Sequence, residues 1–533
     1  MKDKKTRIEI YDTTLRDGTQ AEGVWLSLED KLLIVEKLDS FGVDYIEGGY
    51  PLSNPKDKAF FAEVSRKPPA HAKITAFGMT RRKGVKVEDD EGVKALMDSK
   101  APVVTIVGKS WDLHVKKVLR ASPQENLDMI SESLAALSEA GREVFFDAEH
   151  FFDGYRADAD YAIGTLEAAV TGKASRLVLC DTNGGSLPEF IGRVVEDVRR
   201  RFPDVVIGIH CHNDSALGVA NTLAAVASGA RHVQGTINGI GERCGNADLT
   251  SIIPNLVLKC GYECLTEGAT QRLTEVSRYF SEVANLPLQE NQPFVGLAAF
   301  AHKGGMHVHA VRRSTAAYEH IDPAEVGNTR RILISELAGA TSVAVKTDKK
   351  FNLDQDKNLA KKVIRTVQEM ENQGYQFEAA EASFNLLVRK TLGGKWYRRF
   401  WELDHYRCVI LQTGQNSTST EAIVKIGIDG KSVHTVSEGD GPVNALDGAL
   451  RKALLPHYPS IDQLQLIDYK VRVVNPKAGT AAKVRVVIEF HDTTCGYFGT
   501  VGVDENIIQA SWKALSDAIE YKLLNEQEKK NVE

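Results

Sequence analysis

The stretch Val205-Val206-Ile207-Gly208-Ile209-His210-Cys211-His212-Asn213-Asp214 joins an apolar run to a group of polar side chains. The apolar half predicts a β-strand, and His210 and His212 are two residues apart at its end. Because residues i and i+2 of a strand point to the same face, both imidazoles can reach one metal ion. A bare His-x-His pair is more often a pair of surface or core histidines, so a metal site needs a further ligand elsewhere in the chain.

A complementary stretch near the start of the chain is Tyr11-Asp12-Thr13-Thr14-Leu15-Arg16-Asp17-Gly18. It follows the strand-like run Arg7–Ile10 and puts acids and a cation at the carboxyl end of that strand. If both strands belong to one barrel, their carboxyl ends converge, and Asp17 can then complete a metal site with His210 and His212.

Strand-like runs alternate with helical patterns from residue 7 to about 285. In one such pattern, Ser27–Phe41, Ser27 is a candidate N-cap and Gly42 a candidate stop. Eight strands alternating with helices over roughly 250–280 residues predict a (β/α)8 TIM barrel, with a doubly wound open sheet as the main rival. The predicted strands are Arg7–Tyr11, Tyr45–Gly49, Ile74–Gly78, Val103–Gly108, Glu143–Glu149, Leu177–Thr182, Val205–His212 and Val233–Asn238.

Polar residues gather at the carboxyl ends of six of these eight strands, where barrel enzymes carry their catalytic groups. Any one of them could be an ordinary solvated loop residue, but the joint pattern favours an active site. They are Arg16, Asp17, Glu47, Asp147, Glu149, Asp181, Thr182, Asn183, His210, His212 and the loop Gly239–Asn246.

Composition narrows the class of protein. The chain has 533 residues, a formal net charge of −6 and 43% hydrophobic residues, which gives no reason to expect nucleic acid or a membrane surface as its partner. No stretch approaches the ~20 apolar residues of a membrane span, and the charged start does not resemble a signal peptide. Seven scattered cysteines without framework spacing indicate reduced thiols, and we expect a cytoplasmic multidomain protein.

We predict three parts: a catalytic barrel at 1–285, helical linker subdomains at 286–400 and a regulatory domain at 401–533. The linker contains a loop rich in histidine and glycine, Ala301–His309, which predicts either a lid carrying a catalytic group or a second metal site. Linker helices are predicted at Arg331–Leu337, Asn358–Asn372 and Ala380–Thr391.

The last part contains a weak internal repeat. The alternating strands Ala422–Ile428 and Lys483–Phe490 are each followed by a loop that opens a helix, the second of which is Ile507–Leu523. Two ββα-like halves predict an α+β module that cannot easily cover its own faces. It is either an independent folding unit or a regulatory domain that forms a homodimer and binds a small effector between copies.

Three motifs together resemble the α-isopropylmalate synthase/homocitrate synthase family. They are Asp12–Gly18, His210–Asp214 and Gly241-Glu242-Arg243-Cys244-Gly245-Asn246. The resemblance extends to the loop around His307, to Tyr318–Pro323 and to Gly439–Val443, so it covers nearly the whole chain. It implies a metal-dependent enzyme on a TIM barrel that performs a Claisen condensation.

The resemblance also implies roles for single residues. Asp17, His210 and His212 would bind a divalent cation (Mn²⁺, Mg²⁺, Zn²⁺ or Co²⁺), with Asn246 as a fourth ligand. Arg16 would stabilise the oxygen of an α-keto acid, and Thr182 would bind its carboxylate. Glu47 is expected to form an ion pair with Arg16, and Glu149, His307 and Tyr318 are the candidate acid and base groups.

The substrates follow from finer similarities. Thr500–Leu523 and Phe145–Gly154 are most similar to the members of the family that condense acetyl-CoA with pyruvate, at the entry of a threonine-independent route to isoleucine, and isoleucine is then the expected effector. A different keto acid, as in 2-isopropylmalate or homocitrate synthesis, is the nearest alternative. A lyase of the hydroxymethylglutaryl-CoA type would carry Gly-Cys-Pro where this chain has Cys244-Gly245-Asn246. A non-catalytic effector-binding barrel is the third alternative, and it would not need to retain Arg16, Asp17, His210 and His212.

Overall fold

The computed structural model describes residues 6–266, 268–302, 307, 310–311, 313–332, 357–377, 380–413 and 417–530. The chain forms two compact units. The first contains Met1–Phe300 and His320–Arg330, and the second contains Ala301–Glu319 and Arg331–Glu533. Among the described residues, no helix is both long enough and apolar enough to span a bilayer.

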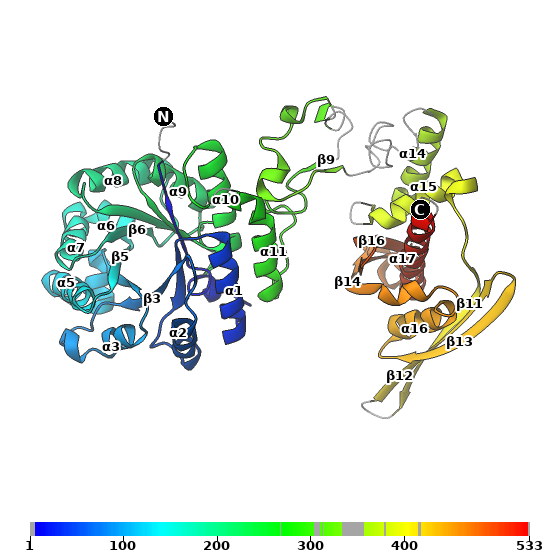
Figure 1. The fold of residues 1–533 in the computed structure, drawn as a ribbon, viewed down its shortest axis with the longest axis horizontal. Helices are drawn as coiled ribbons and strands as arrows, with labels where there is room; N and C mark the ends of the chain where they lie inside the picture. Colours follow the sequence, from blue (N-terminus) through cyan, green and yellow to red (C-terminus); the bar gives the residue numbers. More distant parts are fainter. Residues whose placement is uncertain are drawn as a thin grey trace. The chain divides into compact units, whose positions relative to one another are not determined.

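The first unit is a closed barrel of eight parallel strands in sequential order, β1 to β8, with β8 paired to β1 (Figure 1). Each predicted strand is present, with bounds that differ by at most three residues from the prediction. The strands are β1 Glu9–Asp12, β2 Tyr45–Gly49, β3 Lys73–Met79, β4 Val103–Lys109, β5 Glu143–Glu149, β6 Arg176–Asp181, β7 Val206–Cys211 and β8 His232–Gly235. The predicted TIM barrel is confirmed, and the open sheet is excluded.

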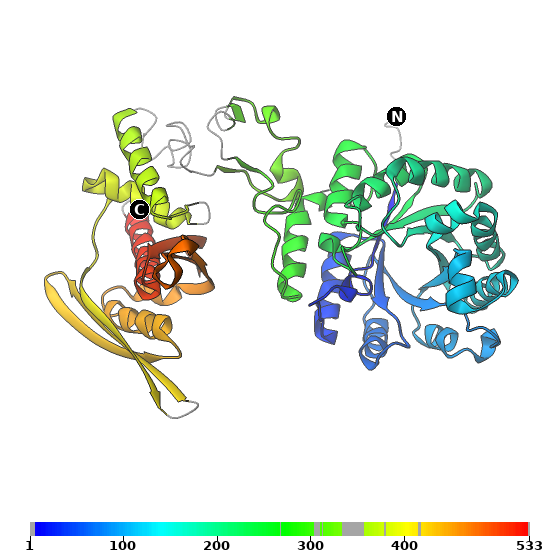
Figure 2. The ribbon, with the colours of Figure 1, turned by 180° about the vertical axis from the view of Figure 1, so that it is seen from behind.

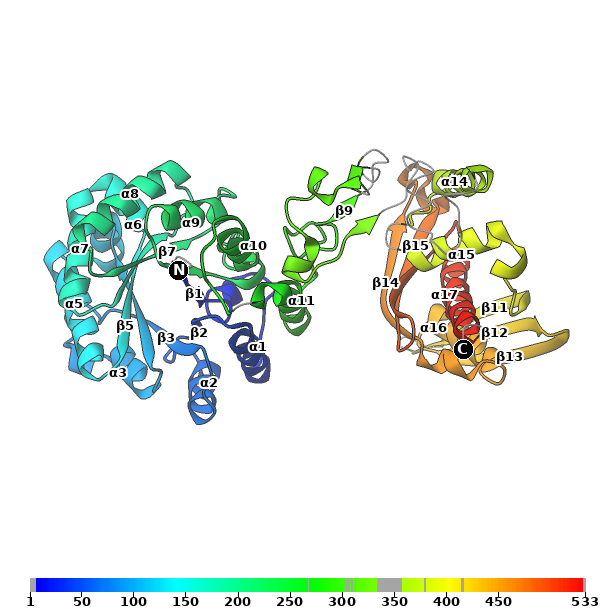
Figure 3. The same cartoon turned by 45° about the horizontal axis from the view of Figure 1, so that its top comes forward.

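Helices connect the strands and surround the barrel (Figure 3). The main ones are α1 Leu28–Phe41, α2 Pro55–Arg66, α3 Glu91–Asp98, α5 Pro123–Glu139, α6 Phe151–Ala157, α7 Ala159–Thr171, α8 Pro188–Arg201, α9 Gly218–Ala227, α10 Leu249–Pro254 and α11 Leu273–Val283. Helix α1 begins with the predicted cap: Ser27 accepts a hydrogen bond from the Asp30 N–H, and the Asp30 carboxylate accepts one from the Ser27 N–H. Gly42, at φ 95°, ends it in the left-handed conformation that glycine tolerates best.

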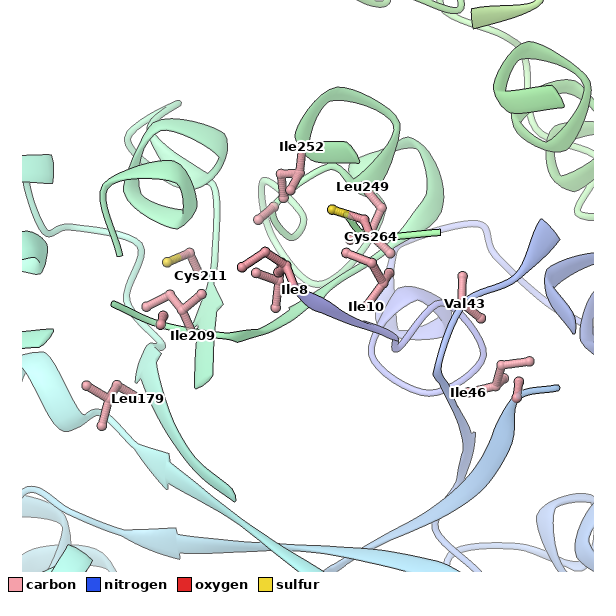
Figure 4. Close-up of a cluster of buried hydrophobic side chains, with 14 of the residues drawn as sticks. Ile8, Ile10, Val43, Ile46, Leu179, Ile209, Cys211, Leu249, Ile252 and Cys264 are labelled. Carbon is pink, nitrogen blue, oxygen red and sulfur yellow. The ribbon is translucent and has the colours of Figure 1, made fainter. Parts of the chain in front are cut away.

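The apolar core of this unit lies between the strands and the surrounding helices. In Figure 4, Ile8 and Ile10 lie beside Leu249 and Ile252 of α10. Inside the barrel, a smaller apolar group consists of Tyr11, Tyr45, Val103 and Phe145. Packing on the outside therefore stabilises the barrel, and polar side chains can occupy part of its interior.

The second unit contains two similar halves (Figure 2). In the first half, β11 Glu402–Thr413, β12 Ser417–Ile428 and β13 Lys431–Gly439 form an antiparallel sheet that packs on α16 Pro442–Leu454. In the second, β14 Gln465–Val473, β15 Val484–Asp492 and β16 Gly496–Asp504 precede α17 Ile507–Lys530. The predicted repeat is confirmed, but each half has three strands rather than two. The two strands named in the prediction lie within β12 and β15, and each of these pairs with an edge strand on either side.

Two predicted linker helices are confirmed as α14 Lys357–Asn372 and α15 Glu381–Leu392, which share a small core with Val501 and Val503 of β16. The helix predicted at Arg331–Leu337 is wrong at its start. Arg331 and Ile332 form strand β10, which pairs with β9, Ala301–His302, and the other five positions lie outside the described residues. The three-part division of the chain stays a prediction.

Candidate active site

The carboxyl end of the barrel brings together Asp17, His210 and His212. Their potential ligand atoms all lie within 4.8 Å of one another, and the three side chains are buried. His210 Nε2 is 3.5 Å from Asp17 Oδ2. Of the described residues, this is the group of His, Cys, Asp and Glu side chains whose geometry can hold a metal ion. The ligand spacing predicted from two distant stretches of sequence therefore corresponds to real proximity.

Backbone geometry explains how Asp17 reaches this position. The chain turns tightly after β1, where the N–H groups of Arg16 and Gly18 both donate to the Thr13 carbonyl. A Cβ atom on Gly18 would lie 2.9 Å from the terminal carbon of the Ile240 side chain, so Ile240 would have to shift to admit a larger residue here. Glycine at this position thus lets the turn after β1 pack closely against Ile240.

The electrostatics of the three side chains suit cation binding. Burial alone would raise the pKa of Asp17, but the charges of Arg16, His210 and His212 lower it to about 2. Burial lowers the pKa of His210, and burial with the neighbouring His210 lowers the pKa of His212 to about 4. At neutral pH the site therefore presents a carboxylate and two uncharged imidazoles, which are the protonation states that bind metals.

Three buried polar atoms at this point have no hydrogen-bond partner in the described structure: Asp17 Oδ1, His212 Nδ1 and Asn246 Oδ1. Leaving a buried donor or acceptor unpaired costs about 1–3 kcal/mol, so several together indicate a missing ligand. Asn246 is tied to the cluster by a β-bridge with His212, and its Nδ2 donates to the Ile240 carbonyl. A divalent cation fits this set of nitrogen and oxygen donors.

Arg16 lies beside the cluster and is held on several sides. Its Nε is 2.6 Å from Glu47 Oε2, its Nη1 is 3.0 Å from Asp17 Oδ2, and its guanidinium carbon is 3.9 Å from the centre of the Phe77 ring. Glu47 is fully buried and also accepts hydrogen bonds from Tyr11 and Thr13. The predicted ion pair between Arg16 and Glu47 is therefore present.

The ends of β5 and β6 supply two further predicted residues. Glu149 forms an ion pair with Lys109 of β4, and the hydroxyl oxygen of Thr182 accepts a 2.8 Å hydrogen bond from the N–H of His150. Arg243 joins neighbouring loops by donating to the Thr182 carbonyl and to Asp214. Glu149 and Thr182 thus both have defined hydrogen-bond or ion-pair partners at the carboxyl end of the barrel.

His307 and Tyr318 belong to the second unit. Their rings stack at a centroid distance of 4.2 Å and an angle of 28°, and Tyr318 is about half exposed. Another histidine of the predicted lid, His302, forms a hydrogen bond with Glu319 through Nε2 at 3.0 Å. The two candidate catalytic groups are therefore adjacent to each other, and their roles at the barrel site stay a prediction.

Sequence reasoning did not single out two side chains that shape this site, Phe77 and Gln234. Phe77 packs on Arg16, and Gln234 connects Asp147 to His210 through 3.1 Å and 2.9 Å hydrogen bonds. Gln234 is the register partner of His210 on the adjacent strand. Since parallel partners point to the same face, this position could have been found by comparing neighbouring strands.

Comparison with known proteins defines the class first. The HMGL-like family model matches residues 7–279, the homocitrate synthase post-HMGL domain-like model matches residues 294–375, and the LeuA allosteric (dimerisation) domain model matches residues 378–523. This is an HMGL-like barrel enzyme with an added LeuA-type domain.

Relatives along the whole chain define the family more closely. The (R)-citramalate synthase of Aquifex aeolicus is 51% identical over 98% of this chain and 99% of its own length, and that of Geobacter sulfurreducens is 48% identical over 98% of both. The 2-isopropylmalate synthase of Methanocaldococcus jannaschii is 31% identical over 98% of this chain and 96% of its own length. The chain belongs to the (R)-citramalate synthase family. The predicted family resemblance and the prediction that the chain is an enzyme of this condensing class are thereby confirmed.

Proposed function

We propose that this chain condenses acetyl-CoA with pyruvate and hydrolyses the resulting thioester, giving (R)-citramalate and free CoA. The observation that carries the proposal is the buried cluster of Asp17, His210 and His212 with Arg16 beside it, in a chain 51% identical to an (R)-citramalate synthase. We further propose that the reaction serves isoleucine synthesis by a threonine-independent route. Seven free cysteines fit a reducing compartment, and we propose the cytoplasm.

Asp17, His210, His212 and Asn246 would hold the divalent cation, which could be Mn²⁺, Mg²⁺, Zn²⁺ or Co²⁺. When bound, the ion would supply Lewis acidity and orient the keto and carboxylate oxygens of pyruvate. Arg16 provides a fixed positive charge where negative charge develops on the keto oxygen. Because Glu47 and Phe77 hold the guanidinium in place, little reorganisation is needed during the reaction.

Thr182 would bind the carboxylate of pyruvate. Its oxygen already accepts the N–H of His150, so its own O–H remains available to donate to a substrate oxygen. Glu149, His307 and Tyr318 are the candidates for removing a proton from the acetyl methyl group and for activating water. Lys109 forms a direct ion pair with Glu149 and would hold its carboxylate in position.

The experiment is release of free CoA from acetyl-CoA, followed with a thiol reagent, in the presence of pyruvate, 2-ketobutyrate, 2-ketoisovalerate or 2-ketoglutarate. Each keto acid is tested with Mn²⁺ and with EDTA. Release that needs both pyruvate and metal supports the proposal. Preference for 2-ketoisovalerate or 2-ketoglutarate would identify a related synthase, and no release with any keto acid would contradict a condensing function.

The second unit would carry regulation. We propose that isoleucine binds the LeuA-type domain and that the chain forms a homodimer through it. Several apolar side chains of its sheets are at least 39% exposed, as expected of faces that a second copy covers. They are Leu403, Val409, Ile410, Leu411, Val436, Leu466, Ile467, Val471 and Val473.

A further inference from the structure

A chain of three buried side chains runs through the barrel interior behind the candidate metal site. Gln234 Nε2 donates to Asp147 Oδ1 at 3.1 Å, and Gln234 Oε1 is 2.9 Å from His210 Nδ1. The exposed fractions are 3% for Asp147, 0% for Gln234 and 5% for His210. The three residues come from different strands, β5, β8 and β7, so the barrel itself sets their arrangement.

The direction of these hydrogen bonds defines the tautomer of His210. An amide oxygen can only accept, so the hydrogen between Gln234 and His210 must be on Nδ1 of the imidazole. The other nitrogen, Nε2, then presents a lone pair, and it is this atom that lies 3.5 Å from Asp17 Oδ2. A neutral imidazole binds a metal through such a lone pair.

Asp147 in turn defines the orientation of the amide. Its carboxyl group accepts the N–H of Gln234, which directs the amide oxygen of Gln234 toward His210. Asp147 lies in register between Val107 of β4 and Val178 of β6. A carboxyl group between two valines is costly to bury, whereas an apolar residue there would pack at no such cost.

We propose that Gln234 and Asp147 are positioning residues that fix the tautomer and ring orientation of His210 and thereby set the metal affinity of the site. The inference rests on the proposed function only in that His210 binds the metal. Substitution of a group that orients a metal-binding histidine in this way typically lowers metal affinity about 10–100-fold. Neither residue needs to touch the substrate for this role.

The test measures Co²⁺ and Zn²⁺ affinity of the metal-stripped full-length protein by competition with a chromophoric chelator. Gln234→Met keeps the length of the side chain but removes both hydrogen bonds, and we expect metal binding to weaken about 10–100-fold. Gln234→Glu retains an acceptor for His210, and we expect an affinity within a few-fold of the parent. Asp147→Leu removes the group that orients the Gln234 amide. We expect it to weaken metal binding more than Gln234→Glu does and less than Gln234→Met does.

The control is Asn328→Leu. Asn328 is also buried in the first unit, and its amide donates to the carbonyls of Phe294 and Gly296, away from the site. It should lower stability while leaving metal affinity unchanged. Should Gln234→Met not fold, the comparison of Asp147→Leu with Gln234→Glu takes its place.

Equal affinity in the parent, Gln234→Met and Asp147→Leu would overturn the inference, as would an equal loss in Asn328→Leu. A structural role alone would change stability and leave the chelator competition unaffected. The substrate assay tests the proposed function separately. If the Gln234 and Asp147 variants bind Co²⁺ more weakly than the parent, but the parent releases no CoA with pyruvate, the inference is supported and the proposed function is refuted.

Discussion

At the scale of single residues, Glu47 holds Arg16 beside Asp17, where the proposed function needs a fixed positive charge. Glu47 is fully buried and is bonded to Arg16, Tyr11 and Thr13. Glu47→Gln leaves the buried guanidinium without its main counter-charge, and we expect kcat to fall about 100–1000-fold, as when one group that stabilises a developing oxyanion is removed. Breaking a buried pair also typically costs about 3–5 kcal/mol of stability.

The measurement is kcat and KM by CoA release, together with thermal unfolding. Glu143→Gln is the matched control, because Glu143 is also a barrel-strand carboxylate but begins β5 and pairs with Lys73. A Glu47→Gln enzyme with the kcat of Glu143→Gln would show that Arg16 does not need this partner.

A second carboxylate, Glu9, predicts a dependence of stability on pH. Burial alone would raise the pKa of Glu9, but hydrogen bonds from His232 and Arg176 lower it from 4.5 to about 2. A lowered pKa means that the stabilising interaction is complete above pH 4.5 and is lost as the pH falls toward 2. The difference in melting temperature between the parent and Glu9→Gln should therefore be largest near neutral pH and shrink steadily below pH 4.5. A melting-temperature difference that stays constant from neutral pH to below pH 4.5 would contradict a lowered pKa for Glu9.

The residues that carry polar chemistry at strand ends could be predicted from the sequence, including the supporting carboxyl groups of Glu47 and Asp147, whereas Phe77 and Gln234 were not found from local patterns. His210, His212 and Asp17 occur in short motifs whose spacing has a direct geometric meaning. Phe77 and Gln234 are ordinary strand residues, and their importance depends on which neighbour each strand has in the closed barrel. That information comes from long-range pairing, which local patterns do not contain.

At the scale of secondary-structure elements, the capping box of α1 gives a direct test. Ser27 Oγ accepts the N–H of Asp30, and the Asp30 carboxylate accepts the N–H of Ser27. Ser27→Ala removes the first of these bonds, and we expect a loss of about 1 kcal/mol in the free energy of unfolding measured with urea. Ser65→Ala, in the last turn of α2, removes an exposed hydroxyl and should change stability by less than about 0.5 kcal/mol. Equal effects would show that the cap contributes nothing specific.

Periodicity located elements well where one face of an element is buried. It identified all eight barrel strands and the helices α14 and α15, because their apolar residues face a core. In the last part of the chain it located only β12 and β15, and it missed β11, β13, β14 and β16. In β11 and β14 the exposed residues include the adjacent pairs Ile410-Leu411 and Leu466-Ile467, which do not alternate. Periodicity also misassigned Arg331 and Ile332, which form a two-residue strand only because Ala301 and His302 are available to pair.

At the scale of the whole molecule, the two units have separate cores. The apolar cluster around the barrel consists of residues between Ile8 and Val326, whereas the clusters of the second unit lie between Val363 and Leu524. Helices α14 and α15 share a core with β16, so a cut at residue 400 would leave Phe384 and Val388 without their partners Val501 and Val503. A cut at residue 356 removes that core as a whole and leaves the barrel cluster intact.

This division predicts which unit would bind the proposed effector, isoleucine. The chain that ends at residue 356 retains Asp17, His210 and His212 and should bind Co²⁺ like the full-length protein, because the barrel core draws on none of the deleted residues. The shortened chain should show no heat of isoleucine binding by titration calorimetry, whereas the full-length protein should bind isoleucine. The mass of the shortened chain by light scattering should be that of a monomer. The metal titration is the control for folding of the barrel. Isoleucine binding by the shortened chain would place the effector site on the barrel unit and contradict regulation through the LeuA-type domain.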